Sequence, residues 1–362
     1  MQIRKSILLL GILAIALMPA CKKDKDDQTD NFDRAAMLEV YRDEFIKPAF
    51  TNVNGLANTL ETVATAFVNN QNTDNLEQLR EGWKDAVLSW ESACAYNFGP
   101  AGESGTRKTL NEEIATFPVS ESKLETILNG GNYSLNDYNR DARGFFAIEF
   151  LIFNGTEAEI ISRFGNANNQ NFLLALCADI NSRLNTVKSA WETDFGNEFT
   201  GEAGTSVGSP VSELYNEFVK SYEILKNYKF GLPLGLMSGQ SSIEPKLVEA
   251  YYSGFSLNLA EAHFKALEEI WKGKNGKVAF RDWLNSVEGG PALVSETEAG
   301  FNSIQSKFNV VNNGSVMSEL IENSPAQLIE IHTEIQKNTR FVKSEMSSLL
   351  GIAITYSSGD GD

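Results

Sequence analysis

Apolar residues recur at steps of three and four along nearly every long segment of this chain, which is the spacing of one face of an α-helix. The segments 73–96 and 173–191 show the pattern most clearly. No pair of alternating apolar and polar runs joined by a hairpin turn is found in the sequence, so it predicts an all-α protein. The other helices are expected at 120–129, 135–153, 210–229, 244–271, 277–287, 291–309 and 325–350.

A stretch rich in Gly and Ser, 197–209, lacks this periodicity and is the best candidate for a domain boundary. The helices expected before it lie within 34–196, and those expected after it lie within 210–362. Each group supplies enough long helices for a bundle. The sequence therefore predicts two helical-bundle domains packed side by side.

The N-terminus has the pattern of a secretory signal over residues 1–20. Two basic residues precede the apolar run Ile7–Leu17, which is too short to span a membrane as a helix. Small residues follow, up to Cys21, and the whole resembles a bacterial lipoprotein signal, in which Cys21 is lipidated and becomes the first residue of the mature chain. Residues 21–33 are charged and polar, so we expect a flexible tether.

The chain is acidic, with a formal net charge of −17, and loss of Arg4 and Lys5 with the signal takes this to −19. Such a chain is not expected to bind nucleic acid or anionic lipid head groups, and it attracts cations. We expect a lipoprotein of the outer membrane in the cell envelope, facing the periplasm or the surface. The run Lys25-Asp26-Asp27 is similar to a short acidic signal that directs lipoproteins to the cell surface.

One carboxylate, Glu149, lies inside the otherwise apolar run Gly144–Phe153. Burying an ionised carboxylate costs several kcal/mol unless a cation or a set of donors meets it. Glu149 could ligate a metal, but the position three residues earlier, where a histidine would share its helical face, is Phe146. Alternatively, a basic side chain or a helix N-terminus from the other half of the chain satisfies it. The residues alone leave both interpretations open.

A second polar cluster consists of Glu249, Ser253 and Ser256, which share one face if 244–271 is a continuous helix. This cluster either lines a pocket or makes local bonds to the backbone. On the same helix His263 would lie about 21 Å from Glu249, so the two are not expected to share a metal.

The chain has two histidines, and two cysteines besides the lipidation candidate. His263 and His332 each stand alone on an apolar stripe and are interpreted as core residues. Cys94 and Cys177 lie on apolar faces of expected helices without metal-ligand spacing, so we interpret them as small core residues. A disulfide between them has no support in the sequence.

The run Gly144–Phe153 resembles the GxHxxE signature of the imelysin-like family of bacterial exported proteins, with Phe146 in place of the histidine. Further pieces resemble the family in the same order, over nearly the whole mature chain. They are Trp83 to Trp90 followed by Phe98-Gly99-Pro100, then Phe117-Pro118-Val119, Leu232-Pro233-Leu234-Gly235, Leu247 to Ser253 with Ser256, and Gly359-Asp360-Gly361-Asp362.

The resemblance implies two helical domains with a pocket at their interface, a link to bacterial iron uptake, and a metal or peptidase role. Iron or another divalent metal is then the candidate cofactor, with Glu149 as the candidate ligand. A zinc peptidase needs about three protein ligands and an activated water, and Phe146 supplies none. The resemblance implies as pocket residues Gly144, Phe146, Glu149, Glu249, Tyr252, Ser253 and Ser256.

Two main hypotheses follow. We favour an exported lipoprotein that binds a ligand or partner in iron uptake, attached to the membrane through Cys21 and working with other iron-uptake components. The alternative is a metallopeptidase of the imelysin type, which the missing histidine makes the weaker hypothesis. A purely structural scaffold for a partner protein is the third.

Overall fold

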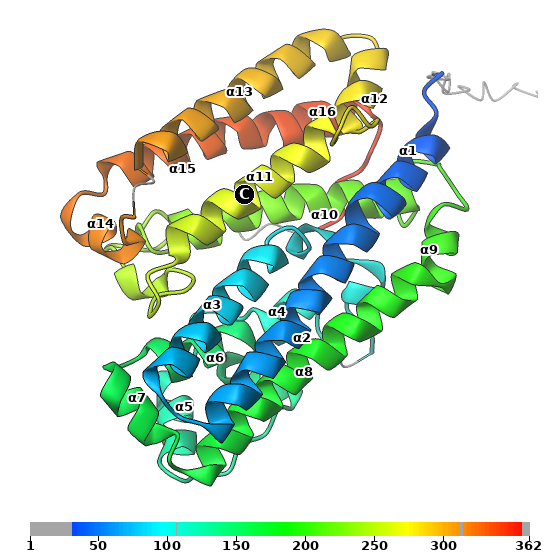
Figure 1. The fold of residues 1–362 in the computed structure, drawn as a ribbon. Coiled ribbons are helices and arrows are strands. Elements are labelled where there is room, and N and C mark those ends of the chain that lie inside the picture. Colours follow the sequence, from blue (N-terminus) through cyan, green and yellow to red (C-terminus); the bar gives the residue numbers. More distant parts are fainter. Residues whose placement is uncertain (1–30, 106, 312–313, 357–362) are drawn as a thin grey trace, which may run out of the picture. The chain divides into compact units, whose positions relative to one another are not determined.

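The computed structural model describes residues 31–105, 107–311 and 314–356. Within these ranges the regular structure is helical, and the single β-bridge, Ser104 with Arg107, belongs to no strand. The all-α prediction is confirmed (Figure 1). The predicted signal, the lipidation site Cys21 and most of the tether lie outside the described residues. No described helix combines the length and the apolar character needed to cross a membrane.

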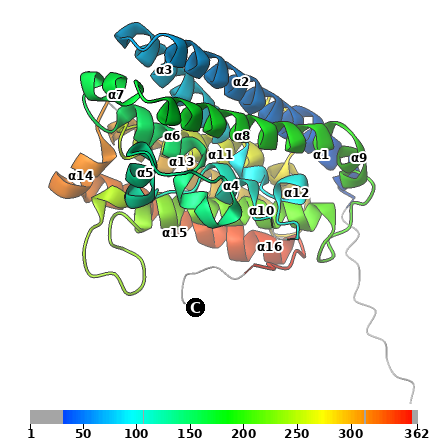
Figure 2. The same cartoon turned by 90° about the horizontal axis from the view of Figure 1, so that it is seen from below.

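The N-terminal helices, α1 to α9, are organised around α2. This helix packs along both α3 and α8, and α6 contacts α3 and α8 in turn (Figures 1 and 2). A π-helical segment, η1, joins α1 to α2. The bounds are α1 Arg34–Val40, η1 Tyr41–Ile46, α2 Lys47–Asn69, α3 Thr73–Trp90, η2 Cys94–Tyr96, η3 Gly99–Ala101, α4 Leu110–Ile114, α5 Glu121–Leu128, η4 Asp137–Ala142, α6 Gly144–Phe153, α7 Glu157–Arg163, α8 Ala167–Glu192 and α9 Asp194–Phe199.

The C-terminal helices, α10 to α16, pack around the pair α13 and α15, and α10 contacts α11 and α15. Two further π-helical segments, η5 and η7, continue α10 and α15. The bounds are α10 Pro210–Ile224, η5 Leu225–Gly231, η6 Pro245–Leu247, α11 Ser256–Lys272, α12 Phe280–Ser286, α13 Gly290–Val311, α14 Met317–Asn323, α15 Ala326–Arg340, η7 Phe341–Glu345 and α16 Met346–Leu349.

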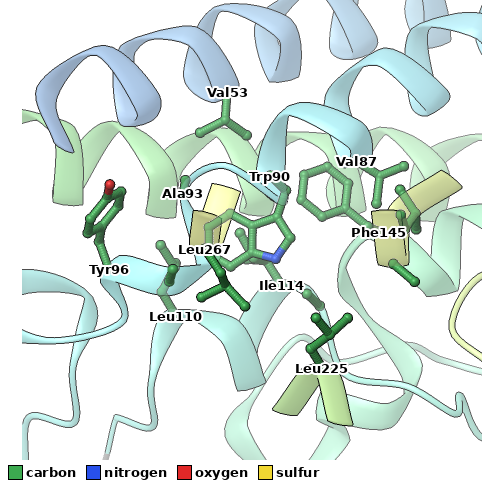
Figure 3. Close-up of a cluster of buried hydrophobic side chains, with 14 of the residues drawn as sticks. Val53, Val87, Trp90, Ala93, Tyr96, Leu110, Ile114, Phe145, Leu225 and Leu267 are labelled. Carbon is green, nitrogen blue, oxygen red and sulfur yellow. The ribbon is translucent and has the colours of Figure 1, made fainter. Parts of the chain in front are cut away.

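From Phe32 onward the described residues form one compact unit. The two groups of helices meet where α10 contacts α1 and η2, and where α11 contacts α3. Trp90 marks this junction, since α3 places it in a cluster that includes Phe145 from α6, Leu225 from η5 and Leu267 from α11 (Figure 3). The division into two domains at 197–209 stays a prediction.

The predicted helix 244–271 is wrong in its first half. The α-helix begins only at Ser256, after the short 3₁₀ segment η6 and a series of turns. Ala250 and Gly254 have φ angles of 54° and 68°. These angles lie in the left-handed region, which a right-handed helix cannot contain. The segment 248–255, here called the serine turn, therefore folds separately from α11.

The predicted helix 135–153 is also interrupted. Arg143 is extended, and α6 begins at Gly144, whose φ is 78°. A Cβ at this position would lie 2.3 Å from the carbonyl oxygen of Ile114, so the close approach of two backbones requires glycine here. This start fixes the direction in which α6 enters the core.

Candidate functional site

Glu149 meets the serine turn. Its side chain is buried on α6, and its Oε1 accepts hydrogen bonds from the Ser253 amide at 2.7 Å and the Ser253 hydroxyl at 2.8 Å. Burial raises the pKa of Glu149 to about 7, while these bonds and one from the Tyr252 backbone oppose the rise. The hydrogen bonds of this carboxylate thus come from the serine turn, which belongs to the C-terminal half of the chain.

The family-signature position Phe146 carries an apolar ring that is itself packed. It makes an edge-to-face contact with Phe117, with ring centroids 5.6 Å apart. Trp83 holds the start of the same helix, because its indole Nε1 donates to the Phe145 carbonyl at 2.7 Å. Helix α6 is apolar on nearly all sides, and so it is enclosed by its neighbours. Glu149 is the one charged side chain it carries.

The other predicted pocket residues divide into two kinds. The Ser253 hydroxyl donates to Glu149 on another helix, as expected of a residue that lines a pocket. The Ser256 hydroxyl instead donates locally, to the Ala250 carbonyl at 3.3 Å. Tyr252 is half-buried, and its hydroxyl donates to Glu121 at 2.8 Å. The structure brings together Glu149 and Ser253, which only the family resemblance had placed in one pocket. Their use as a ligand site stays a prediction.

Glu249 belongs to a buried ion cluster next to this contact. The Lys229 ammonium, on η5, lies 2.6 Å from an oxygen of Glu249 and 2.6 Å from an oxygen of Glu91 at the end of α3. All three side chains are buried. Burial raises the pKa of both carboxyls, and Lys229 opposes the rise. Burial alone would lower the pKa of Lys229, but the two carboxylates outweigh it, so the lysine stays charged.

His263 joins the same cluster, which corrects the expectation that it lies far from Glu249. Its Nδ1 is 3.6 Å from Glu91 Oε2, and its Nε2 is 2.7 Å from the Ser221 hydroxyl. Because the serine turn folds back instead of extending α11, Glu249 and His263 both approach Lys229 and Glu91. His263 is buried as expected, and burial and Lys229 hold its pKa well below the usual range.

Lys229, Glu91 and Ser221 were missed by the sequence analysis. Each looks like an ordinary polar position on a helix, and only the packing of three distant segments reveals the group. A usable signal was present at Lys229, which is flanked by aromatic residues in the run Tyr228-Lys229-Phe230. A second buried ion pair, Arg143 with Glu113 at 3.5 Å, was missed for the same reason.

Glu149 was also predicted to be a metal ligand. Within the described ranges, it belongs to no group of three or more His, Cys, Asp or Glu side chains that could hold an ion. Its bonded neighbours are serine and backbone donors, which stabilise the carboxylate by hydrogen bonds. The role of Glu149 as a metal ligand stays a prediction.

These features define a class of all-helical proteins in which a glutamate on an apolar helix that begins at glycine accepts hydrogen bonds from a serine turn in the other half of the chain. The chain belongs to the imelysin family, whose model, described as Imelysin, matches residues 46–332. The resemblance noted in the sequence is therefore confirmed.

Relatives with known sequences or structures agree. The chain is 22% identical to Iron-regulated protein A of Synechococcus elongatus over 285 residues, which cover 76% of this chain and 73% of the relative. An imelysin-like protein from Psychrobacter arcticum has a similar fold, with a TM-score of 0.69 at 17% identity, over 89% of this chain and 97% of the other. A protein from Parabacteroides distasonis, described as an iron-regulated protein A precursor, gives a TM-score of 0.72 at 13% identity, over 87% and 95%.

Proposed function

We propose that this protein is an exported, lipid-anchored binding component of bacterial iron uptake, and that the serine turn forms its recognition surface. The observation that carries the proposal is the contact of Glu149 with Ser253. A buried carboxylate fixes the backbone and the hydroxyl of a turn whose residues 251–255 are half-buried and reach the solvent. Such an anchor holds a loop in one conformation before a ligand arrives, which lowers the entropy cost of binding.

The chemistry of this surface suits a ligand with both apolar and polar parts. Tyr251 and Tyr252 pack edge to face, with ring centroids 5.2 Å apart, and Lys246 lies 5.9 Å from the Tyr251 ring. Glu121 accepts the Tyr252 hydroxyl at 2.8 Å. Aromatic rings with a polar rim are the usual composition of a binding hot spot. The link to iron rests on the names of the relatives, and anchoring at the outer membrane rests on the Cys21 signal.

A metallopeptidase of the imelysin type is the less favoured alternative. Peptide hydrolysis by a metal requires several ligands and an activated water, and Glu149 is committed to the serine turn. Phe146 further supplies a packed ring where the family has an imidazole. Binding needs neither a metal nor a water at this position, and so it fits the residues better.

A titration of purified protein tests the proposal. Ferric citrate, ferrous iron and haem are added separately, and the change in tyrosine fluorescence is followed. We expect saturable binding of one of them, weakened about tenfold or more by Glu149→Gln, since a loosened turn loses its preorganisation. Glu125→Gln, on the exposed face of α5, is the matched control and should bind normally. Absence of binding by all three probes, or hydrolysis of peptides that Glu149→Gln abolishes, contradicts the proposal.

A further inference from the structure

A group of potential metal ligands lies apart from the signature position. The Glu91 carboxylate, the Cys94 thiol and the His263 imidazole have ligand atoms that all lie within 4.8 Å of one another. Glu91 and Cys94 come from the end of α3 and the start of η2, three residues apart, and His263 comes from α11. We propose that these three side chains form a binding site for a borderline-soft divalent cation of the zinc type.

The distances fit the coordination that such an ion prefers. Glu91 Oε2 is 3.6 Å from His263 Nδ1 and 3.8 Å from Cys94 Sγ. Bonds of about 2.0 Å to oxygen and nitrogen and about 2.3 Å to sulfur, at tetrahedral angles, place neighbouring ligand atoms roughly 3.3–3.6 Å apart. Both measured separations exceed this by only a few tenths of an ångström. The third pair, the Cys94 thiol and the His263 ring, lies within 4.8 Å.

The surroundings of the imidazole have the form of a metal site. A histidine that binds a metal through one ring nitrogen usually donates the N–H of its other ring nitrogen to a neighbouring acceptor. This hydrogen bond fixes the tautomer. In His263, Nε2 lies 2.7 Å from the Ser221 hydroxyl, whereas Nδ1 is buried, faces Glu91 and makes no hydrogen bond among the described residues. The ring is therefore oriented with Nδ1 toward the centre of the group.

The charges in the cluster balance when a dication is present. With Cys94 as the thiolate and both Glu91 and Glu249 ionised, three negative charges face the Lys229 ammonium and one divalent ion. Lys229 contacts Glu91 Oε2 at 2.6 Å, and a carboxylate oxygen has two lone pairs, so the same oxygen can meet the ammonium and the ion. Glu91 Oε1, which is buried and makes no hydrogen bond within the described ranges, offers a second point of coordination.

Cys94 is half-buried, whereas Glu91 and His263 are buried. A groove of about 660 Å³ beside α3 and α11 is lined by Ser92 and Ala262, the sequence neighbours of Glu91 and His263, but by none of the three proposed ligands. Three protein ligands leave one coordination position for water or for a further ligand. The site lies beyond the proposed recognition function of the serine turn, since neither Glu149 nor Ser253 belongs to it.

Cobalt(II) spectroscopy of the purified full-length protein tests the site. Cobalt is the probe because a cobalt–thiolate bond produces a charge-transfer band that carboxylate and imidazole ligands do not. We expect binding of one equivalent with this band, and competition by zinc(II). Cys94→Ser should remove the band, and His263→Gln should weaken binding at least about 100-fold, since even the loss of a group that supports a ligand costs 10–100-fold. Ser221→Ala, which removes such a support, should weaken binding by about 10–100-fold.

The chain supplies its own controls. Cys177→Ser and His332→Gln remove the other thiol and the other imidazole of the described residues, and both variants should retain the band and the affinity. Circular dichroism checks that each variant folds, and the band of the unaltered protein remains decisive if a variant does not. Absence of a thiolate band in the unaltered protein overturns the proposal. So does a band that Cys177→Ser removes, or an affinity that His263→Gln leaves unchanged.

Discussion

Replacement of Lys229 by methionine should destabilise the protein severely. The ammonium lies 2.6 Å from oxygens of both Glu91 and Glu249, and the three side chains are at most 5% exposed. Methionine has a similar length but no charge, so Lys229→Met leaves two carboxyls facing each other without a cation. Removing one partner of a buried ion pair costs about 3–5 kcal/mol, and we expect a loss of that size in the free energy of unfolding at pH 8.

The loss should depend on pH with a defined sign. Without the lysine, the folded variant stays intact by binding protons at Glu91 and Glu249, whereas both carboxylates are ionised in the unfolded chain above about pH 5. The unfolded state then binds fewer protons than the folded state, and stability falls as the pH rises. In the unaltered protein burial also raises the pKa of Glu91, to about 8, but Lys229 holds this pKa lower than it is in the variant. The difference between the unaltered protein and Lys229→Met should therefore widen as the pH rises from 7 to 9, where Glu91 of the unaltered protein ionises first.

Urea unfolding followed by circular dichroism, in the presence of a chelator, measures both effects. Lys337→Met is the matched control, because Lys337 makes a comparable contact of 2.7 Å with Glu334 on the surface of α15. Exposed pairs contribute about 1 kcal/mol or less, so this variant should change little. A loss below about 1 kcal/mol for Lys229→Met, equal at pH 7 and pH 9, would refute the account of the cluster.

Three further changes follow from the same structure. The pKa of Glu149 is about 7 in the folded protein against an ordinary 4.5, so the stability contributed by its protonated form is lost as the pH rises from 4.5 to 8. In urea unfolding over this range, the free energy of unfolding of Glu149→Gln should rise by roughly 3 kcal/mol relative to that of the unaltered protein. A difference between the two proteins that stays constant with pH contradicts this. Phe146→His should raise the affinity for zinc(II) in calorimetric titration, because it restores an imidazole one turn from Glu149, and an unchanged affinity contradicts the interpretation of Phe146. Gly144→Ala should lower the free energy of unfolding, measured by thermal unfolding, by at least about 1 kcal/mol, because the added Cβ would lie 2.3 Å from the Ile114 carbonyl oxygen. The control Gly55→Ala, where a Cβ has open space, should be neutral or stabilising.

The sequence predicted the long amphipathic helices well because their spacing is a local property. The pattern in 73–96 corresponds to α3 with the short η2 after it, and the pattern in 173–191 lies within α8. The helix predicted over 244–271 was wrong in its first half, because residues at helical spacing there belong to the serine turn. Ala250 has a φ of 54°, and alanine gives no sequence signal for a left-handed angle.

The same distinction between local and distant information applies to the site. Glu149 could be singled out because one carboxylate in an apolar run is anomalous by itself. Spacing also singled out Ser253, but only the resemblance to a family implied that it lies near Glu149. The group formed by Glu91, Lys229 and His263 requires three segments that are far apart in the chain, and no periodicity relates them.

The π-helical segment η5 has a consequence for how relatives of this protein should be compared. A π-turn contains one residue more than the α-turn it replaces, so deleting a single residue ahead of Lys229 in the segment Leu225–Gly231 would restore a regular helix after α10. Everything downstream in the segment would then rotate by about 100° around the helix axis. Lys229 would no longer point at Glu91 and Glu249. An aligned relative with a one-residue gap between α10 and Lys229 should therefore have lost the basic residue and at least one of the two acids together.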